Sequence, residues 1–180
     1  MTLEVRPAVE ADLPGLVDVA ARTFPLACPP SASPDDVAAF IAANLSPASF
    51  REYLADPDRV VLTARDDAQS DRSILGYAML IRGVAADDDV ARAVPLRPAV
   101  ELSKMYVLPT SHGVGVSGAL MSAALDHART SGTTCVWLGV NQENQRAMRF
   151  YGKHGFTVSG TKTFQLGDRV EHDYVMVRPL

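Results

Sequence analysis

The stretch that decides the fold is ELSKMYVLPTSHGVGVSGALMSAAL, residues 101–125. Residues 102–108 predict an apolar strand that ends at Pro109. A short polar loop and three glycines follow, at Gly113, Gly115 and Gly118. The apolar residues after them recur at helical spacing, so the stretch ends in a predicted helix.

A strand, a glycine loop and a helix start, in that order, form a site for an anion. Glycine lets the backbone turn tightly and removes side chains that would block a close ligand. The first amides of a helix have no partner inside the helix and carry partial positive charge. A phosphate satisfies them, so the stretch predicts a cradle for a diphosphate.

Length and composition indicate one soluble domain, residues 1–180. The formal net charge is −4, which gives no basic patch for nucleic acid. The first six residues, Met-Thr-Leu-Glu-Val-Arg, already include two charged side chains, and no long apolar run follows. We therefore expect a cytoplasmic protein without membrane or metal contacts, with Cys28 and Cys135 as reduced thiols.

The remaining chain predicts an α/β fold: one mixed sheet of about seven strands with helices on both faces. Pro25 is expected to end the first helix, and Ser-Pro pairs at Ser33 and Ser46 to begin the next two. Asp87–Asp89 is expected in a loop, either solvated or forming an acidic wall for a cationic substrate. The predicted strands cover residues 2–6, 59–64, 74–81, 102–108, 134–140, 156–166 and 170–177.

The glycines also match the GxGxxG spacing of dinucleotide-binding folds, so such a fold is an alternative interpretation. In that fold the first glycine follows the strand almost directly, whereas four residues, 109–112, intervene here. An acidic residue should also end the next strand, about 20 residues on. Here that strand ends in Asn141, so the dinucleotide interpretation is disfavoured.

A second segment, WLGVNQENQRAMRFYGKHGF at residues 137–156, completes a pattern. Together with Val107-Leu-Pro109 and the loop from His112, it resembles the GCN5-related N-acetyltransferases, in which N-x-x-A-x-x-F-Y-x-x-x-G-F follows the second central strand. The resemblance covers essentially the whole chain and implies that the sheet is splayed at its two central parallel strands. The C-terminal run TFQLGDRVEHDYVMVRPL is similar to the PaiA-like spermine/spermidine acetyltransferase branch, which implies a polyamine or similar primary amine as acceptor.

The resemblance implies that acetyl-coenzyme A is the co-substrate, with its diphosphate on the loop amides and its pantetheine arm between the splayed strands. Asn144 would contact the coenzyme, although it also fits a plain helix cap. His112 and Ser117 depart from the family pattern, which puts affinity in question. The implied coenzyme-binding residues are Met105, Tyr106, Val107, His112, Gly113, Val114, Gly115, Val116, Ser117, Gly118, Asn144 and Tyr151.

Tyr151 is the first catalytic candidate, because a phenol with an ordinary pKa near ~10 can protonate a departing thiolate. An amine acceptor must lose a proton before it attacks, and the candidate bases are Glu101, Glu143, Asp173 or a water chain. Glu101 enters the central strand, where the family often places a carboxylate.

Other functions remain open at this point. The acceptor amine could belong to a protein, a peptide or an antibiotic. From a different class, the chain could be a coenzyme A-binding sensor without turnover, which the departures at His112 and Ser117 favour and Tyr151 disfavours. Homodimers are common in the family that the chain resembles.

Overall fold

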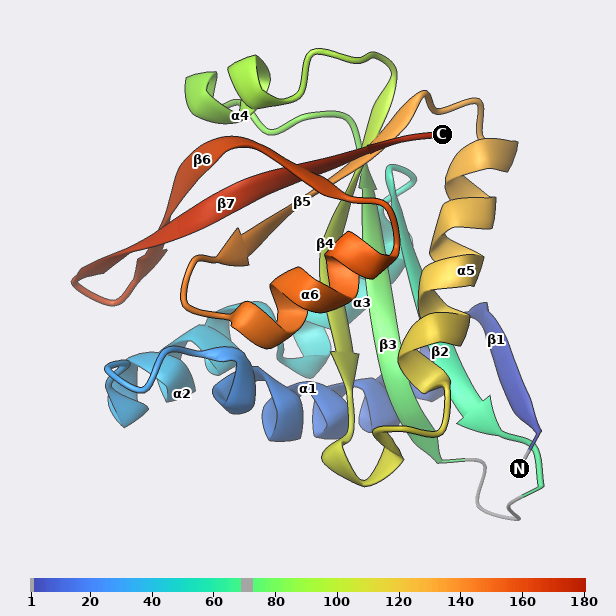
Figure 1. Ribbon diagram of the computed structural model, residues 1–180. Helices are drawn as coiled ribbons and strands as arrows, with labels where there is room; N and C mark the ends of the chain where they lie inside the picture. Colours follow the sequence, from blue (N-terminus) through green and yellow to red (C-terminus); the bar gives the residue numbers. More distant parts are fainter. Residues whose placement is uncertain (1, 69–72) are drawn as a thin grey trace.

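The computed structural model describes residues 2–68 and 73–180. Within them, one seven-stranded mixed sheet carries helices on both faces, which confirms the expected fold class (Figure 1). The strand order is β1-β2-β3-β4-β5-β7-β6, and among these described strands only β4 and β5 are parallel neighbours. The strands are β1 (Leu3–Pro7), β2 (Arg59–Asp66), β3 (Ile74–Arg82), β4 (Ala99–Val107), β5 (Cys135–Asn141), β6 (Thr157–Leu166) and β7 (Arg169–Pro179).

Two layers of helices enclose the sheet. The first three α-helices share an apolar core with β2 and β3, whereas α5 covers the opposite face with residues spaced as the sequence predicts. The α-helices are α1 (Leu13–Ala27), α2 (Pro34–Asn44), α3 (Pro47–Ala55), α4 (Asp88–Ala93), α5 (Val116–Thr130) and α6 (Gln145–Lys153). Two short 3-10 turns, η1 (Glu10–Asp12) and η2 (Pro109–Ser111), precede α1 and α5.

The predicted helix starts at the two Ser-Pro pairs are confirmed. Ser33 accepts a hydrogen bond from the amide of Asp36 and Ser46 from that of Ser49, so each serine caps its helix. The predicted stop at Pro25 is wrong, because α1 continues to Ala27. The helix ends instead at Cys28, which is extended, as expected for a residue that precedes a proline.

The three aspartates at 87–89 begin a helix, so the expected loop is also wrong there. The side chain of Asp87 accepts hydrogen bonds from the amides of Asp89 and Val90 and caps α4. Acidic residues at a helix N-terminus stabilise the helix, because their negative charge lies next to the positive end of its dipole. These aspartates line neither of the two cavities described below, so they form no acidic wall there.

The two central parallel strands stay together over only a short length. β4 and β5 pair at Ala99 with Cys135, Val100 with Val136, and Glu101 with Trp137, and then diverge (Figure 1). The register between β3 and β4 also shifts here, so that Ser103 lies in a bulge without a residue directly opposite. A bulge bends the strand that carries it, and the sheet is consequently open beyond Glu101.

The close approach of β3 to β4 generates a stability prediction. A Cβ atom at Gly76 would lie 2.8 Å from the Tyr106 carbonyl oxygen and 2.9 Å from a methyl of Val107. We expect Gly76→Ala to lower the free energy of unfolding by about 1–3 kcal/mol, because the overpacked strands must move apart. Denaturant unfolding measures the change.

Gly152→Ala is the matched control. Gly152 lies within α6, and an added Cβ would meet nothing within 4 Å. This substitution should raise stability by about 0.4–1 kcal/mol, because it lowers the conformational entropy of the unfolded chain. Equal stability of the two variants would show that β3 and β4 have room that the structure does not show.

Candidate active site

Two adjoining cavities lie where β4 and β5 diverge. The inner cavity has a volume of about 300 Å³ and reaches the C-terminal hairpin of β6 and β7. The outer cavity, of about 230 Å³, opens beside the glycine loop. The two are continuous, because six residues line both: Ala27, Met105, Tyr106, Asn144, Ala147 and Tyr151.

The glycine loop has the backbone expected of an anion cradle. Gly113 and Gly115 have φ angles of 84° and 88°, which favour glycine, and Gly115 caps α5. Among the described residues, none accepts a hydrogen bond from the amides of residues 113–118. A Cβ at Gly113 or Gly118 would meet nothing within 4 Å, so the loop has open space on the side of these two glycines. These features fit a phosphate group.

His112 connects this loop to two other parts of the site. An Nη of Arg146, on α6, lies 2.9 Å from its Nδ1, and its Nε2 lies 3.2 Å from the Val107 carbonyl oxygen, at the end of β4. A guanidinium only donates, so Nδ1 accepts and Nε2–H donates. The amide of His112 donates to the Pro109 carbonyl at 3.2 Å, so it is not one of the free amides of the loop. The contact of its side chain with Arg146 was not predicted from the sequence.

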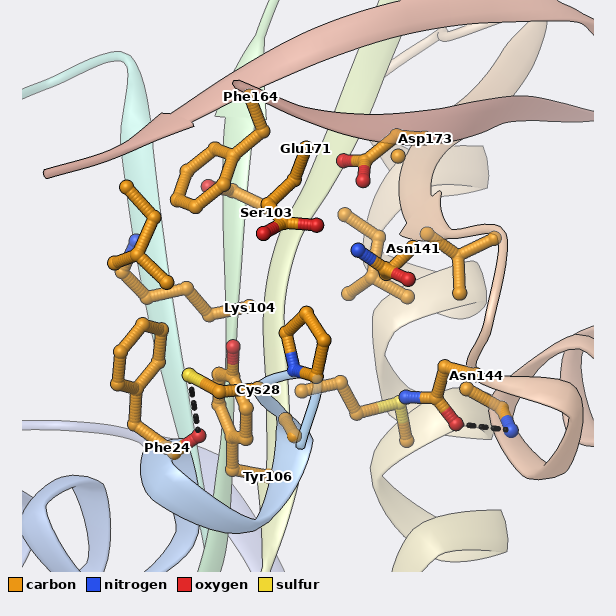
Figure 2. A pocket seen from close by; sticks show the side chains of 18 of the residues that line it. Phe24, Cys28, Ser103, Lys104, Tyr106, Asn141, Asn144, Phe164, Glu171 and Asp173 are labelled. Carbon is orange, nitrogen blue, oxygen red and sulfur yellow. Dashed lines mark hydrogen bonds between the residues drawn. The ribbon is translucent and has the colours of Figure 1, made fainter. Parts of the chain in front are cut away.

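Asn144 caps α6, as the plain interpretation predicts. Its Oδ1 accepts a hydrogen bond of 3.1 Å from the amide of Ala147 (Figure 2). Within the described residues, the side-chain nitrogen has no hydrogen-bond partner, although the residue lines both cavities. That nitrogen is free to donate to a bound ligand, so capping and ligand contact are compatible.

Tyr151 lies on α6 at the junction of the two cavities. Edge contacts with Phe150 and Phe156, at ring separations of 5.6 and 5.9 Å, fix its ring. Burial raises the pKa of Tyr151 to about 12. No described residue forms a hydrogen bond with its hydroxyl group, so a protonated phenol is available at this position to donate a proton.

Two of the three candidate bases line the inner cavity. Burial raises the pKa of Glu101, on β4, although nearby Lys162, Lys104 and Arg59 oppose the shift. Burial likewise raises the pKa of Asp173, on β7, against the opposing effect of Lys162. A raised pKa brings a carboxyl group closer to the range in which a general base works.

Glu143 is exposed in the loop before α6 and lines neither cavity. The structure therefore brings Glu101 and Asp173 together with Tyr151 around one space, and leaves Glu143 outside it.

Lysine side chains in the inner cavity were not anticipated. The Nζ of Lys162 lies 3.4 Å from Asp173, and its chain crosses β5 over Gly139, where a Cβ would collide with it. The hairpin turn contained the signal, because pairing Leu166 with Arg169 places Lys162 opposite Asp173. Lys104 also lines this cavity, from β4.

Across residues 2–68 and 73–180, no group of three or more His, Cys, Asp or Glu side chains is placed to hold a metal ion. Helices in these ranges are also too short or too polar to cross a bilayer.

Comparison with known proteins places this geometry in context. Residues 21–156 match the acetyltransferase (GNAT) family. An uncharacterized N-acetyltransferase of Mycobacterium tuberculosis is 54% identical over 169 residues, covering 94% of this chain and 98% of the relative. The L-methionine sulfoximine/L-methionine sulfone acetyltransferase of Salmonella typhimurium is 32% identical over 95 residues, 49% of this chain and 55% of that protein.

A solved structure shares the fold. The PaiA N-acetyltransferase from Thermoplasma acidophilum, crystallised in complex with coenzyme A, superposes with a TM-score of 0.76 at 20% sequence identity, covering 100% of both chains. At this identity the likeness shows the fold alone.

The raised pKa of Glu101 predicts how stability depends on pH. The folded state holds the Glu101 proton to a higher pH than the unfolded chain does, so wild-type stability falls as pH rises from the unfolded pKa of ~4.3 toward the folded value. Glu101→Gln removes this loss. We expect its Tm to match wild type near pH 4 and to exceed it at neutral pH.

Calorimetry of both proteins across this range measures the difference. Glu143→Gln is the control, because a change at an exposed carboxylate usually alters stability by less than about 0.5 kcal/mol. A Glu101→Gln protein less stable than wild type at neutral pH would contradict the assigned effect of burial.

Proposed function

The chain belongs to the acetyltransferase (GNAT) family, and we propose that it transfers the acetyl group of acetyl-coenzyme A directly to the primary amine of a small acceptor. The observation that carries the proposal is the placement of Tyr151 where the two cavities join. The outer cavity adjoins the anion cradle, and the inner cavity contains the carboxylates. Each substrate therefore has its own space, with a proton donor between them.

In this proposal the coenzyme occupies the cradle and the outer cavity. Its diphosphate accepts hydrogen bonds from the free amides of residues 113–118. Its pantetheine arm follows residues 105–107 of β4, which do not pair with β5. The amides of the arm can therefore form hydrogen bonds with the backbone groups of these residues, as an added strand would. The side-chain nitrogen of Asn144 is a further donor.

Acetyl transfer forms a C–N bond and breaks the C–S bond, with the electron pair of the latter leaving on sulfur. The acceptor nitrogen must be unprotonated to attack. We assign Glu101, directly or through water, as the group that takes the amine proton, with Asp173 as the alternative. Tyr151 protonates the departing thiolate, because its raised pKa keeps the phenol protonated at neutral pH.

The cysteines support direct transfer without a covalent enzyme intermediate. Cys135 is buried within β5. Cys28 lines the inner cavity, but burial raises the pKa of its thiol, and the thiol donates to the Phe24 carbonyl at 3.4 Å (Figure 2). A nucleophilic cysteine needs the opposite, a lowered pKa or an adjacent base.

The acceptor class has support from two sides. The carboxylates of the inner cavity and the resemblance to the PaiA-like branch favour a polyamine or similar cationic amine. The relative that acetylates methionine sulfoximine favours an amine on an amino acid. A peptide or antibiotic amine, and binding of coenzyme A without turnover, are the competing functions that the following experiment separates.

The test is release of free thiol from acetyl-coenzyme A with a panel of amines: spermidine, spermine, putrescine, an amino acid, an aminoglycoside, and peptides with a free lysine or N-terminus. We expect release with a small amine, and Tyr151→Phe should lower kcat by about 10²- to 10⁴-fold while coenzyme binding is kept. Tyr174→Phe, which removes a phenol outside both cavities, is the control.

Coenzyme binding without thiol release from any amine would favour the sensor instead. An unchanged kcat in Tyr151→Phe would remove the proton-donor assignment.

The cradle makes a separate prediction about coenzyme affinity. Gly113→Glu places a carboxylate before the free amides, so we expect coenzyme A binding to weaken by at least about 100-fold in calorimetric titration. Gly132→Glu is the matched control, because Gly132 also has a positive φ, of 74°, and open space, but lies past the far end of α5. Equal affinity of the two variants would place the diphosphate elsewhere.

A further inference from the structure

We propose that the acceptor carries a carboxylate as well as its amine, and that Lys104 binds this carboxylate. The inference rests on the proposed function and specifies its acceptor. Lys104 then acts as the residue that selects amino acids over polyamines.

The bulge in β4 is what turns Lys104 into the inner cavity. Side chains alternate along a regular strand, so residues three apart face opposite sides. Because Ser103 is an extra residue in the strand, Lys104 faces the same side as Glu101. Glu101, Lys104 and Tyr106 all line the inner cavity. The alternate residues, Leu102 and Met105, belong to the apolar core beneath α5, although both also border the inner cavity.

The charges around the cavity leave one cation and one carboxylate unmatched. Lys162 pairs with Asp173 at 3.4 Å, and Glu171 with Arg169 at 3.4 Å. Arg59, near the far end of Lys104, pairs with Asp56 at 2.9 Å. Among the described residues, neither Lys104 nor Glu101 has an ion-pair partner within 4.0 Å.

Both unmatched groups are removed from bulk water. Burial lowers the pKa of Lys104 and raises that of Glu101, because removal from water disfavours the charged form of each group. The ring of Tyr53 lies 5.8 Å from the Lys104 ammonium group and provides only a weak cation–π contact. A ligand of opposite charge would relieve each group.

A ligand with two different charges fits this arrangement. In Figure 2 the side chain of Lys104 extends toward one end of the cavity, away from Asn144, while Asp173 lies on the opposite wall. An amine beside Glu101 and a carboxylate at Lys104 match both. A polyamine would bring a second cation toward Lys104, and like charges in a partly buried site repel.

The experiment compares three sets of acceptors by thiol release. α-, β- and γ-Amino acids are each tested beside the carboxamide of the same skeleton and the diamine of the same length. We expect the best amino acid to exceed its amide in kcat/KM by roughly 10- to 100-fold, the range of a hydrogen bond to a charged group. Lys104→Met should lower that ratio to near one without changing the affinity for coenzyme A.

Two further variants separate a specific role from a general one. Lys104→Arg keeps the charge and should retain most of the preference for the amino acid. Lys153→Met removes an exposed lysine on α6 outside both cavities and should leave the ratio unchanged.

Amides or diamines that react as well as the amino acids would overturn the assignment of Lys104. So would a Lys104→Met protein that keeps the wild-type ratio. If no amino acid is acetylated, the inference fails, and turnover of the amides and diamines then shows that the proposed function stands without it.

Discussion

The short pairing between β4 and β5 is the constraint on which the site depends. Only three residue pairs hold these strands side by side, and beyond Glu101 each has backbone groups that its neighbour does not satisfy. Buried backbone groups need partners, so the opening suits a ligand with its own amides. The cradle, α6 and the C-terminal hairpin all reach this one opening, and the two cavities meet there.

Local signals in the sequence predicted much of this arrangement. The glycine loop, the serine caps and the apolar stripe of α5 each depend on residues within one or two turns of the chain, and the structure bears them out. Local signals also failed, as at Pro25, where the proline falls in the last turn of α1 and the next proline ends the helix. Asp87 was read as a loop residue although it caps a helix.

Contacts between distant segments could not be read from the sequence in the same way. The bond between His112 and Arg146 joins residues 34 positions apart, and it requires α6 to lie beside the cradle. Lys104 faces the cavity only because β4 has a bulge, and no residue type in the sequence predicts that bulge. The pair of Lys162 and Asp173 was within reach, since the two-residue turn at Gly167 fixes the register of the hairpin. Sequence therefore predicted the local structure of the glycine loop and its helix better than the arrangement of side chains in the inner cavity.

The bulge at Ser103 has a consequence for how such a site can diverge. If β4 kept its sequence but lost the bulge, regular alternation would turn Lys104 and Tyr106 to the face beneath α5, and Met105 and Val107 to the face that carries Glu101. Such a change of register would exchange polar for apolar side chains on this face without any substitution, whereas deleting Ser103 itself would leave Lys104 on the side of Glu101. The side chains that face the acceptor cavity therefore depend on how β4 pairs with β3, and substitution scanning of the pocket alone does not sample that dependence.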